Sequence, residues 1–404
     1  MAYNTLPAAA TLTPTPFEAR VPDEELGAFT QLLKLSKIAP ETYENRIAEV
    51  KDFRHWGISR DWLAKAKQHW ETSYSWRKTE DRINSFPNFT VPIENGGTKL
   101  DIHLVALYSE KKDATPLLLL HGWPGSFLEF LGALDVLRGK YGPAELPFHV
   151  IVPSLPGYGY SSGPPLDGNF QCEDIASVMD KLMVGLGFGG GYVTQGGDIG
   201  SFVSRILGKT SASCKAVHLN LCIGVDKSQE VPVSSLSKEE QAGLERNANF
   251  GTLGNAYARE HGTRPSTIGL VLSSSPLALL AWIGEKFLAW TDVSPPLDEI
   301  LDSVTLYWFT SSFPRCIYPY RQFFGPSPAS FHNSPDFYLD KPMGYSWHHR
   351  ELAPIPKAWV EKTGNLVWYR GHFEGGHFAA MEKPELFVKD MEDFVGELKT
   401  QGTV

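Results

Sequence analysis

Short, continuous runs of apolar residues, separated by amphipathic segments, constrain the fold of this chain more than any other feature. Strands that are apolar along their whole length are buried on both faces, as happens when helices cover both sides of a parallel sheet. The chain is therefore predicted to have an α/β core with a mostly parallel central sheet. The runs are L-D-I-H-L-V-A-L-Y from Leu100, P-L-L-L-L-H-G from Pro116, F-H-V-I-V-P-S-L from Phe148 and Y-V-T-Q-G-G from Tyr192.

Helical patterns separate these runs, and the same alternation returns near the C-terminus, with N-L-V-W-Y-R from Asn365 as a strand and a final helix from about Lys383 to Lys399. Residues 226–341 lack the alternation. They carry helical patterns instead, including P-L-A-L-L-A-W-I-G from Pro276 and L-D-E-I-L-D-S-V from Leu297. This stretch is predicted to be a helical lid inserted over the core.

The chain divides into four segments on this basis. Residues 1–95 begin rich in Pro, Thr and Ala and continue with helical patterns, so they are expected to form an N-terminal helical arm that packs on the core and the lid. Residues 96–225 and 342–404 are expected to be the first and last parts of the core, with the lid at 226–341 between them.

The net charge and the cysteine content limit the partners and the cellular compartment that the chain is expected to have. A net charge of -9 with no cluster of Lys and Arg argues against a nucleic-acid partner, which is bound by clustered positive charge. The N-terminus lacks a signal-peptide pattern and no long uncharged apolar window follows, so we expect a cytoplasmic protein without a membrane anchor. The four cysteines form no C-x-x-C pair and are expected to be buried free thiols: Cys172, Cys214, Cys222 and Cys316.

Three glycine-rich motifs compete as sites of chemistry. G-L-G-F-G-G at 185–190 follows a helix and precedes a strand, the reverse of the order in dinucleotide-binding folds. G-Y-S-S-G, centred on Ser161, is followed by two prolines that block the helix a nucleophile elbow needs. G-G-D-I-G, centred on Asp198, follows a predicted strand and opens a helical pattern. Asp198 is therefore the candidate nucleophile, with a helix N-cap as its structural alternative.

The histidine and the acid of such a site follow the nucleophile in the chain order of an α/β-hydrolase. His377 lies in a Gly-rich loop between the last strand and the last helix, where the base is expected. Glu351 follows the strand G-Y-S-W-H-H and is the candidate acid that orients the imidazole. Glu374 and Glu361 are its competitors in sequence proximity.

An oxyanion hole requires one backbone N–H from the residue after the nucleophile and one from a loop after an earlier strand. Ile199 supplies the first, and Trp123 in H-G-W-P-G-S supplies the second. No cofactor and no metal ion is predicted, because the histidine pairs at 372/377 and 348/349 match no zinc spacing.

An aspartate nucleophile indicates attack on a saturated carbon. A serine would leave a stable ether on such a carbon. An aspartate instead leaves an ester, and water can attack the carbonyl carbon of that ester. The substrate class is therefore an epoxide or an alkyl halide.

The motifs H-G-W-P, G-G-D-I-G-S and E-G-G-H-F-A-A, together with the helical arm, resemble those of the microsomal-type epoxide hydrolases, most closely the soluble fungal branch, from about Pro16 to the C-terminus. The resemblance implies that two lid tyrosines, Tyr257 and Tyr320, donate hydrogen bonds to the epoxide oxygen, with Tyr318 as a rival for the second role. It also implies a cis peptide bond between Trp123 and Pro124. Close fungal relatives often carry aspartate where this chain has Glu351.

The sequence thus predicts a hydrolase that converts epoxides to vicinal diols through an ester on Asp198, which water activated by His377 hydrolyses. The alternatives left open are a haloalkane dehalogenase with the same nucleophile and base, a non-catalytic receptor on this fold and a serine esterase acting through Ser161. The expected partner is a small-molecule epoxide. The oligomeric state stays open, with a homodimer as one option.

Overall fold

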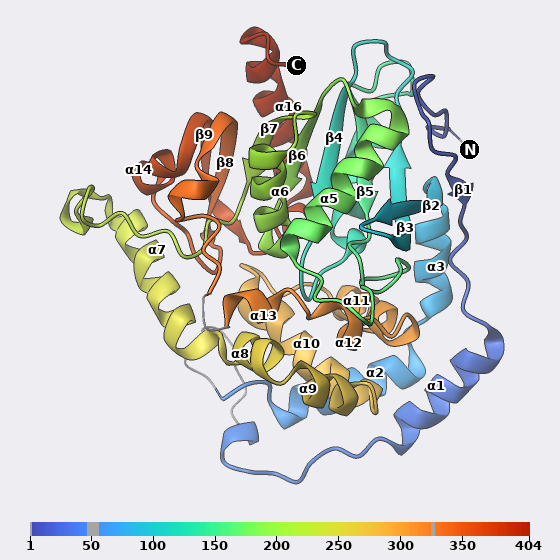
Figure 1. Ribbon diagram of the computed structural model, residues 1–404. Helices are drawn as coiled ribbons and strands as arrows, with labels where there is room; N and C mark the ends of the chain where they lie inside the picture. The colour runs from blue at the N-terminus through green and yellow to red at the C-terminus, as the bar shows by residue number, and fades with distance from the viewer. Residues whose placement is uncertain (1, 47–55, 325–327) are drawn as a thin grey trace.

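The computed structural model describes residues 2–46, 56–324 and 328–404, and within them one nine-stranded sheet carries helices on both faces (Figure 1). The strand order is β1-β2-β3-β5-β4-β6-β7-β8-β9. The pairs from β1 to β5 are antiparallel, whereas every pair from β5 through β4 to β9 is parallel. The predicted α/β-hydrolase core is confirmed. The strands are β1 (Thr15–Pro16), β2 (Asn88–Asn95), β3 (Thr98–Leu107), β4 (Thr115–Leu120), β5 (Phe148–Pro153), β6 (Tyr192–Gly196), β7 (Cys214–Leu219), β8 (Leu339–Arg350) and β9 (Gly364–Gly376).

Every predicted apolar run forms a strand, and the structure adds three strands that the pattern did not identify, namely the two-residue β1, β2 and β7. In β7, Lys215 and His218 interrupt the apolar run. In β2, Pro92 stands inside the strand, and the side chains alternate between buried and exposed. β2 belongs to the segment assigned to the arm, yet it pairs along its whole length with β3.

Two apolar cores join the sheet to its helices. One core contains the buried faces of α4 (Leu131–Lys140) and α16 (Pro384–Thr400). The other contains those of α5 (Cys172–Met183) and α6 (Asp198–Thr210) on the opposite face of the sheet. The parallel strands are therefore covered on both sides, as their apolar sequences require.

The N-terminal arm carries the helices α1 (Asp23–Leu35), α2 (Arg60–Thr72) and α3 (Trp76–Asn84). In Figure 1, α1 and α2 lie beside the lid, whereas α3 stands next to β2 and β3. Hydrogen bonds from His69, Trp70, Tyr74 and Thr79 join the arm to one lid helix, α11 (Leu297–Phe309). The Trp70 indole N–H donates to Thr305 Oγ1 at 3.1 Å, and the Tyr74 hydroxyl donates to Asp302 Oδ1 at 2.8 Å. The arm thus contacts the lid through buried polar groups as well as apolar ones.

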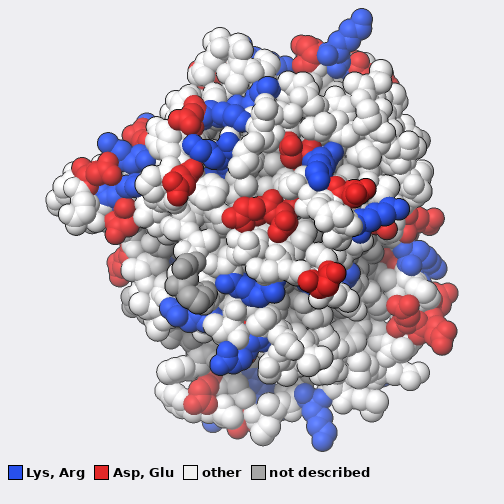
Figure 2. Space-filling view, in the orientation of Figure 1, with Lys and Arg blue, Asp and Glu red and all other residues white. Residues whose placement is uncertain are grey.

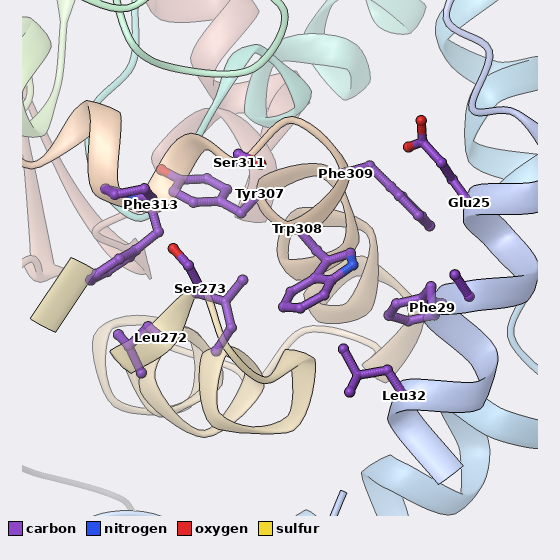
Figure 3. A pocket seen from close by; sticks show the side chains of 13 residues that line it. Glu25, Phe29, Leu32, Leu272, Ser273, Tyr307, Trp308, Phe309, Ser311 and Phe313 are labelled. Atoms are coloured by element: carbon purple, nitrogen blue, oxygen red, sulfur yellow. The ribbon is translucent and has the colours of Figure 1, made fainter. Parts of the chain in front are cut away.

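A cavity of about 310 Å³ lies where α1 meets the lid (Figure 3). Phe29 and Leu32 reach it from the arm, and Trp308 and Phe313 reach it from the lid. The packing between arm and lid is therefore largely aromatic.

The lid forms a layer of helices below the sheet in Figure 1. Within the described residues, no single helix is long and apolar enough to cross a bilayer. The helices α9 (Pro265–Leu272) and α10 (Pro276–Trp290) meet that test only when counted together, and they bend by 116° at their junction. The lid helices are α7 (Lys238–Asn249), α8 (Ala256–Thr263), α9 (Pro265–Leu272), α10 (Pro276–Trp290), α11, α12 (Ser312–Cys316) and α13 (Tyr320–Phe323). Two short helices, α14 (Lys357–Val360) and α15 (Ala379–Glu382), complete the last part of the core.

Two further expectations concern side chains. All four cysteines are free and buried, as predicted. On the face shown in Figure 2, basic and acidic residues are interspersed rather than gathered into one basic patch.

Candidate active site

Asp198 stands at the sharp turn where β6 ends and α6 begins. Its φ of 43° lies in the left-handed region, which is strained for a residue with a side chain. The flanking glycines leave no room for a Cβ: one built on Gly196 would lie 2.1 Å from the Gly200 oxygen, and one on Gly200 would lie 2.1 Å from the Leu120 oxygen. The predicted strand–turn–helix context of G-G-D-I-G is therefore present.

The Asp198 carboxylate does not cap its own helix. The N-cap residue is Gly197, and Asp198 Oδ1 instead accepts a hydrogen bond of 2.7 Å from the Trp123 backbone N–H. The peptide bond between Trp123 and Pro124 is cis, as expected. A Cβ built on Gly122 would lie 2.1 Å from Asp198 Oδ1 and 2.6 Å from the Ile199 nitrogen, so this glycine leaves the space in which the carboxylate oxygen and the Ile199 backbone N–H lie.

His377 lies between two carboxylates. Its Nε2 is 3.3 Å from Asp198 Oδ2, and its Nδ1 is 2.6 Å from Glu351 Oε1. His377 follows β9 and is held by a hydrogen bond from its backbone N–H to the Trp290 oxygen at 3.0 Å. The rival acids lie elsewhere, because Glu374 pairs with Lys383 and Glu361 pairs with Lys357.

The two carboxylates control the protonation of His377. Burial lowers the pKa of an imidazole, but Glu351 and Asp198 outweigh it and raise the pKa of His377 above its ordinary 6.5. Near neutral pH the imidazole is therefore held as a cation.

Tyr257 and Tyr320 approach Asp198 from two lid helices, α8 and α13. Their ring centroids are 5.8 Å apart, and Tyr257 stacks on the Trp123 indole at 4.9 Å. Burial raises the pKa of each phenol well above 10, so both remain protonated donors. Tyr320 Oη is buried and has no hydrogen-bond partner among the described residues other than the neighbouring Tyr257 hydroxyl.

One cavity of about 220 Å³ brings these tyrosines and Asp198 together. Tyr318 is engaged elsewhere, since its hydroxyl donates to the Pro156 oxygen at 3.0 Å. The remaining cavity wall is mostly apolar and includes Phe202, Leu221, Ile223, Phe250, Phe323, Phe324 and Phe331.

The alternative motifs take structural roles. Ser161 accepts a hydrogen bond from the His103 backbone N–H and donates to the Ser154 oxygen, so its hydroxyl is fixed inside a loop. His372 Nε2 contacts Asp390 Oδ2 at 2.7 Å, and His348 stacks on His372. Within residues 2–46, 56–324 and 328–404, no group of three or more His, Cys, Asp or Glu side chains could hold a metal ion.

The sequence did not reveal the residues that contact the acid and the cavity wall without lining the cavity themselves. Asn220, directly after the unidentified strand β7, points its amide nitrogen at Glu351 Oε2 at 3.4 Å. Arg205 on α6 donates to His332 Nδ1 at 2.8 Å, and Ser201 contacts the other nitrogen of that ring at 3.0 Å. His332 adjoins Phe331 in the cavity wall, so α6 fixes both the nucleophile and this wall. Recognising β7 would have drawn attention to Asn220.

Comparison with known proteins agrees with this geometry. Two family models match, "Epoxide hydrolase N terminus" over residues 14–130 and "alpha/beta hydrolase fold" over residues 115–277. The solved epoxide hydrolase of Aspergillus niger is 50% identical, with a TM-score of 0.92 over 98% of this chain and 100% of that one. A chain of Dothistroma septosporum provisionally named an epoxide hydrolase is 42% identical over 97% of this chain and 92% of that one. Epoxide hydrolase 1 of Sus scrofa is 31% identical over 96% of this chain and 89% of that one.

The fold and the candidate site define the class as α/β-hydrolases. Within that class, the chain belongs to the microsomal-type epoxide hydrolases and is an epoxide hydrolase enzyme.

Proposed function

We propose that this enzyme opens epoxides in two steps through a covalent ester on Asp198. Asp198 Oδ2, the oxygen not bound by Trp123, attacks a ring carbon, and the bond between that carbon and the ring oxygen breaks. Tyr257 and Tyr320 donate hydrogen bonds to this oxygen, and one of them transfers its proton as negative charge develops. A carboxylate suits this step because its alkyl ester keeps a carbonyl that water can attack.

The second step hydrolyses the ester. Formation of the ester removes the charge of Asp198 that helps hold His377 protonated, so the imidazole can release its proton and act as a base. Water bonds to Asp198 Cγ and gives a proton to His377 Nε2, while the Trp123 and Ile199 N–H groups stabilise the oxyanion. The diol alkoxide then leaves, taking the proton from His377. The proton of the regenerated carboxyl returns to the tyrosinate, and His377 takes up from solvent the proton that it released to solvent after ester formation, which restores the starting state.

One observation carries this proposal: a single cavity is lined by the candidate nucleophile and by two lid phenols. A halide leaves without a proton, so a haloalkane dehalogenase has no use for paired phenolic donors. The apolar wall suits epoxides with an aryl or alkyl substituent. In this proposal residues 226–341 form the lid, residues 96–225 and 342–404 form the core, and residues 1–95 form the arm that holds the lid.

A His377→Gln variant tests the mechanism, because it should form the ester and fail to hydrolyse it. After mixing with an aryl epoxide, intact-protein mass spectrometry is expected to show an adduct of the full epoxide mass that maps to Asp198. His349→Gln is the matched control and should turn over without accumulating an adduct. An adduct formed only with a bromoalkane would favour the dehalogenase, and no adduct with either reagent from a folded variant would refute the ester mechanism.

A further inference from the structure

A second, smaller cavity lies on the core side of Asp198, whereas the substrate cavity lies on the lid side. Its volume is about 20 Å³, enough for one water molecule. Asp198 lines both cavities, and His377 lines the smaller one together with Gln195, Glu129 and apolar side chains such as Phe387. The nucleophile and the base therefore meet at a space of the size of the co-substrate water.

Gln195 leaves an unpaired acceptor at this cavity. The residue is 1% exposed, and its Nε2 donates to Asn220 Oδ1 at 2.8 Å. Its Oε1 is buried and has no hydrogen-bond partner among the described residues. Buried acceptors are normally paired with a protein donor or an ordered water, so this oxygen points to a water in the cavity.

Glu129 contributes a second polar group. It lies in the 3-10 turn Phe127–Phe130, and a Cβ built on Gly125 would lie only 1.3 Å from Glu129 Oε1, so the glycine makes room for the carboxyl. Burial raises the pKa of Glu129 to about 8; the His377 cation opposes this shift and the Asp198 charge adds to it. Near neutral pH the carboxyl is therefore mostly protonated, and it can both donate and accept a hydrogen bond.

We propose that this small cavity seats the water molecule that hydrolyses the Asp198 ester, and that Glu129 and Gln195 are positioning residues that orient it. The inference rests on the ester mechanism proposed above. The water oxygen bonds to Asp198 Cγ, its proton passes to His377 Nε2, and the bond between Cγ and Oδ2 breaks, so that Oδ2 leaves with the diol and the water oxygen stays in the carboxylate. Glu129 and Gln195 hold the water by hydrogen bonds and undergo no net change of protonation.

Replacing Glu129 should slow the second step alone. In Glu129→Leu, single-turnover kinetics with an aryl epoxide are expected to show unchanged ester formation and hydrolysis slowed roughly 10- to 100-fold, the usual effect of misplacing a reactant. kcat and KM then fall together while kcat/KM is preserved, which a general loss of structure would not produce. Glu129→Gln keeps the hydrogen-bonding shape and should hydrolyse within about threefold of the wild type. Glu361→Leu, on an exposed ion pair, is the control.

The results of these experiments distinguish failure of the water-site proposal from failure of the ester mechanism on which it rests. Ester hydrolysis at the wild-type rate in Glu129→Leu would overturn the role of Glu129, and a Glu129→Gln variant as slow as Glu129→Leu would overturn positioning in favour of proton transfer. Absence of any Asp198 ester, in these variants and in His377→Gln alike, would overturn the mechanism itself.

A second measurement needs no variant. A high-resolution crystal structure of the wild-type protein is expected to show a water within hydrogen-bonding distance of both Glu129 and Gln195 Oε1. Well-defined side chains around a cavity without water density would overturn the proposal.

Discussion

Tyr257 and Tyr320 reach the cavity from different helices, and each offers a phenol that burial keeps protonated. We predict that Tyr257→Phe and Tyr320→Phe each slow ester formation by about 10²-fold or more, because the ring oxygen then leaves with one proton donor fewer. Stopped-flow fluorescence should detect the change, since Trp123 stacks on Tyr257.

Tyr318→Phe is the matched control for these variants. It removes a phenol two residues from Tyr320 whose hydroxyl is bonded to the Pro156 oxygen. Its ester-formation rate should stay near that of the wild type. If Tyr318→Phe slows this step as much as Tyr320→Phe does, the assignment of the second donor is wrong.

Glu351 is the acid proposed to orient His377 and to set the pH at which the imidazole becomes a base. It is the largest of the influences that raise the pKa of His377, so Glu351→Gln lowers that pKa. We predict that the acid limb of the kcat profile moves to lower pH, and that the plateau falls roughly 10²- to 10⁴-fold because the base is no longer oriented. Glu374→Gln, on an exposed ion pair with Lys383, should leave the profile unchanged. An unmoved acid limb in Glu351→Gln would contradict this assignment.

Candidate residues inside short motifs could be found from the sequence, whereas supporting residues could not. Asp198, Trp123 and His377 occur in motifs whose glycines and neighbours reflect tight turns. Gln195 and Asn220 matter only because β6 and β7 lie side by side in the sheet. No local pattern reports such a cross-strand contact.

At the scale of elements, the turn between β6 and α6 depends on glycines that no side chain can replace. A Cβ on Gly200 would overlap the Leu120 oxygen of β4, and that backbone cannot withdraw from the sheet. We predict that Gly200→Ala lowers the free energy of unfolding by about 3 kcal/mol or more. Urea denaturation followed by circular dichroism measures this change in the free energy of unfolding.

Gly27→Ala, within helix α1, is the control substitution at a glycine that has free space around it. Nothing lies within 4 Å of a Cβ at Gly27, so the substitution should raise stability by about 0.5–1 kcal/mol through helix propensity. Equal effects of Gly200→Ala and Gly27→Ala would contradict the close packing inferred for the elbow.

Elements were predictable wherever burial is two-sided and periodicity is uninterrupted. β4 is apolar from Pro116 onward, β5 is interrupted only by His149, and α10 and α11 carry long helical patterns. β2 was not predicted because its sequence is that of a half-exposed antiparallel strand, without a continuous apolar run, and it follows helical patterns in the arm. Its membership of the sheet depends on pairing with β3, which is a tertiary contact.

At the scale of the whole molecule, the arm ties the lid to the core. β1 and β2 of the arm extend the sheet, while α1 and α2 contact lid helices. The tyrosines proposed to bind the epoxide oxygen are carried by the lid, and the nucleophile is carried by the core. Their alignment therefore depends on the arm, although residues 2–46 and 56–95 of the arm contribute no side chain to the substrate cavity.

Trp70 offers a direct test of that dependence. It is 3% exposed, packs against Phe29 and bonds to Thr305 of the lid. We predict that Trp70→Ala lowers the free energy of unfolding by about 3–5 kcal/mol, as expected for truncation of a buried indole. KM should also rise and proteolysis of the lid should accelerate, because the lid loses a fixed contact with the arm.

Trp56→Ala is the matched control, since Trp56 is 67% exposed and should change stability by no more than about 0.5 kcal/mol. Urea denaturation, steady-state kinetics and timed trypsin digestion separate the two contributions of Trp70. A Trp70→Ala variant that loses stability yet keeps the wild-type KM and lid cleavage rate would show that the arm only stabilises the fold. A raised KM measured well below the unfolding transition would instead mean that the arm holds the two tyrosines in register with Asp198.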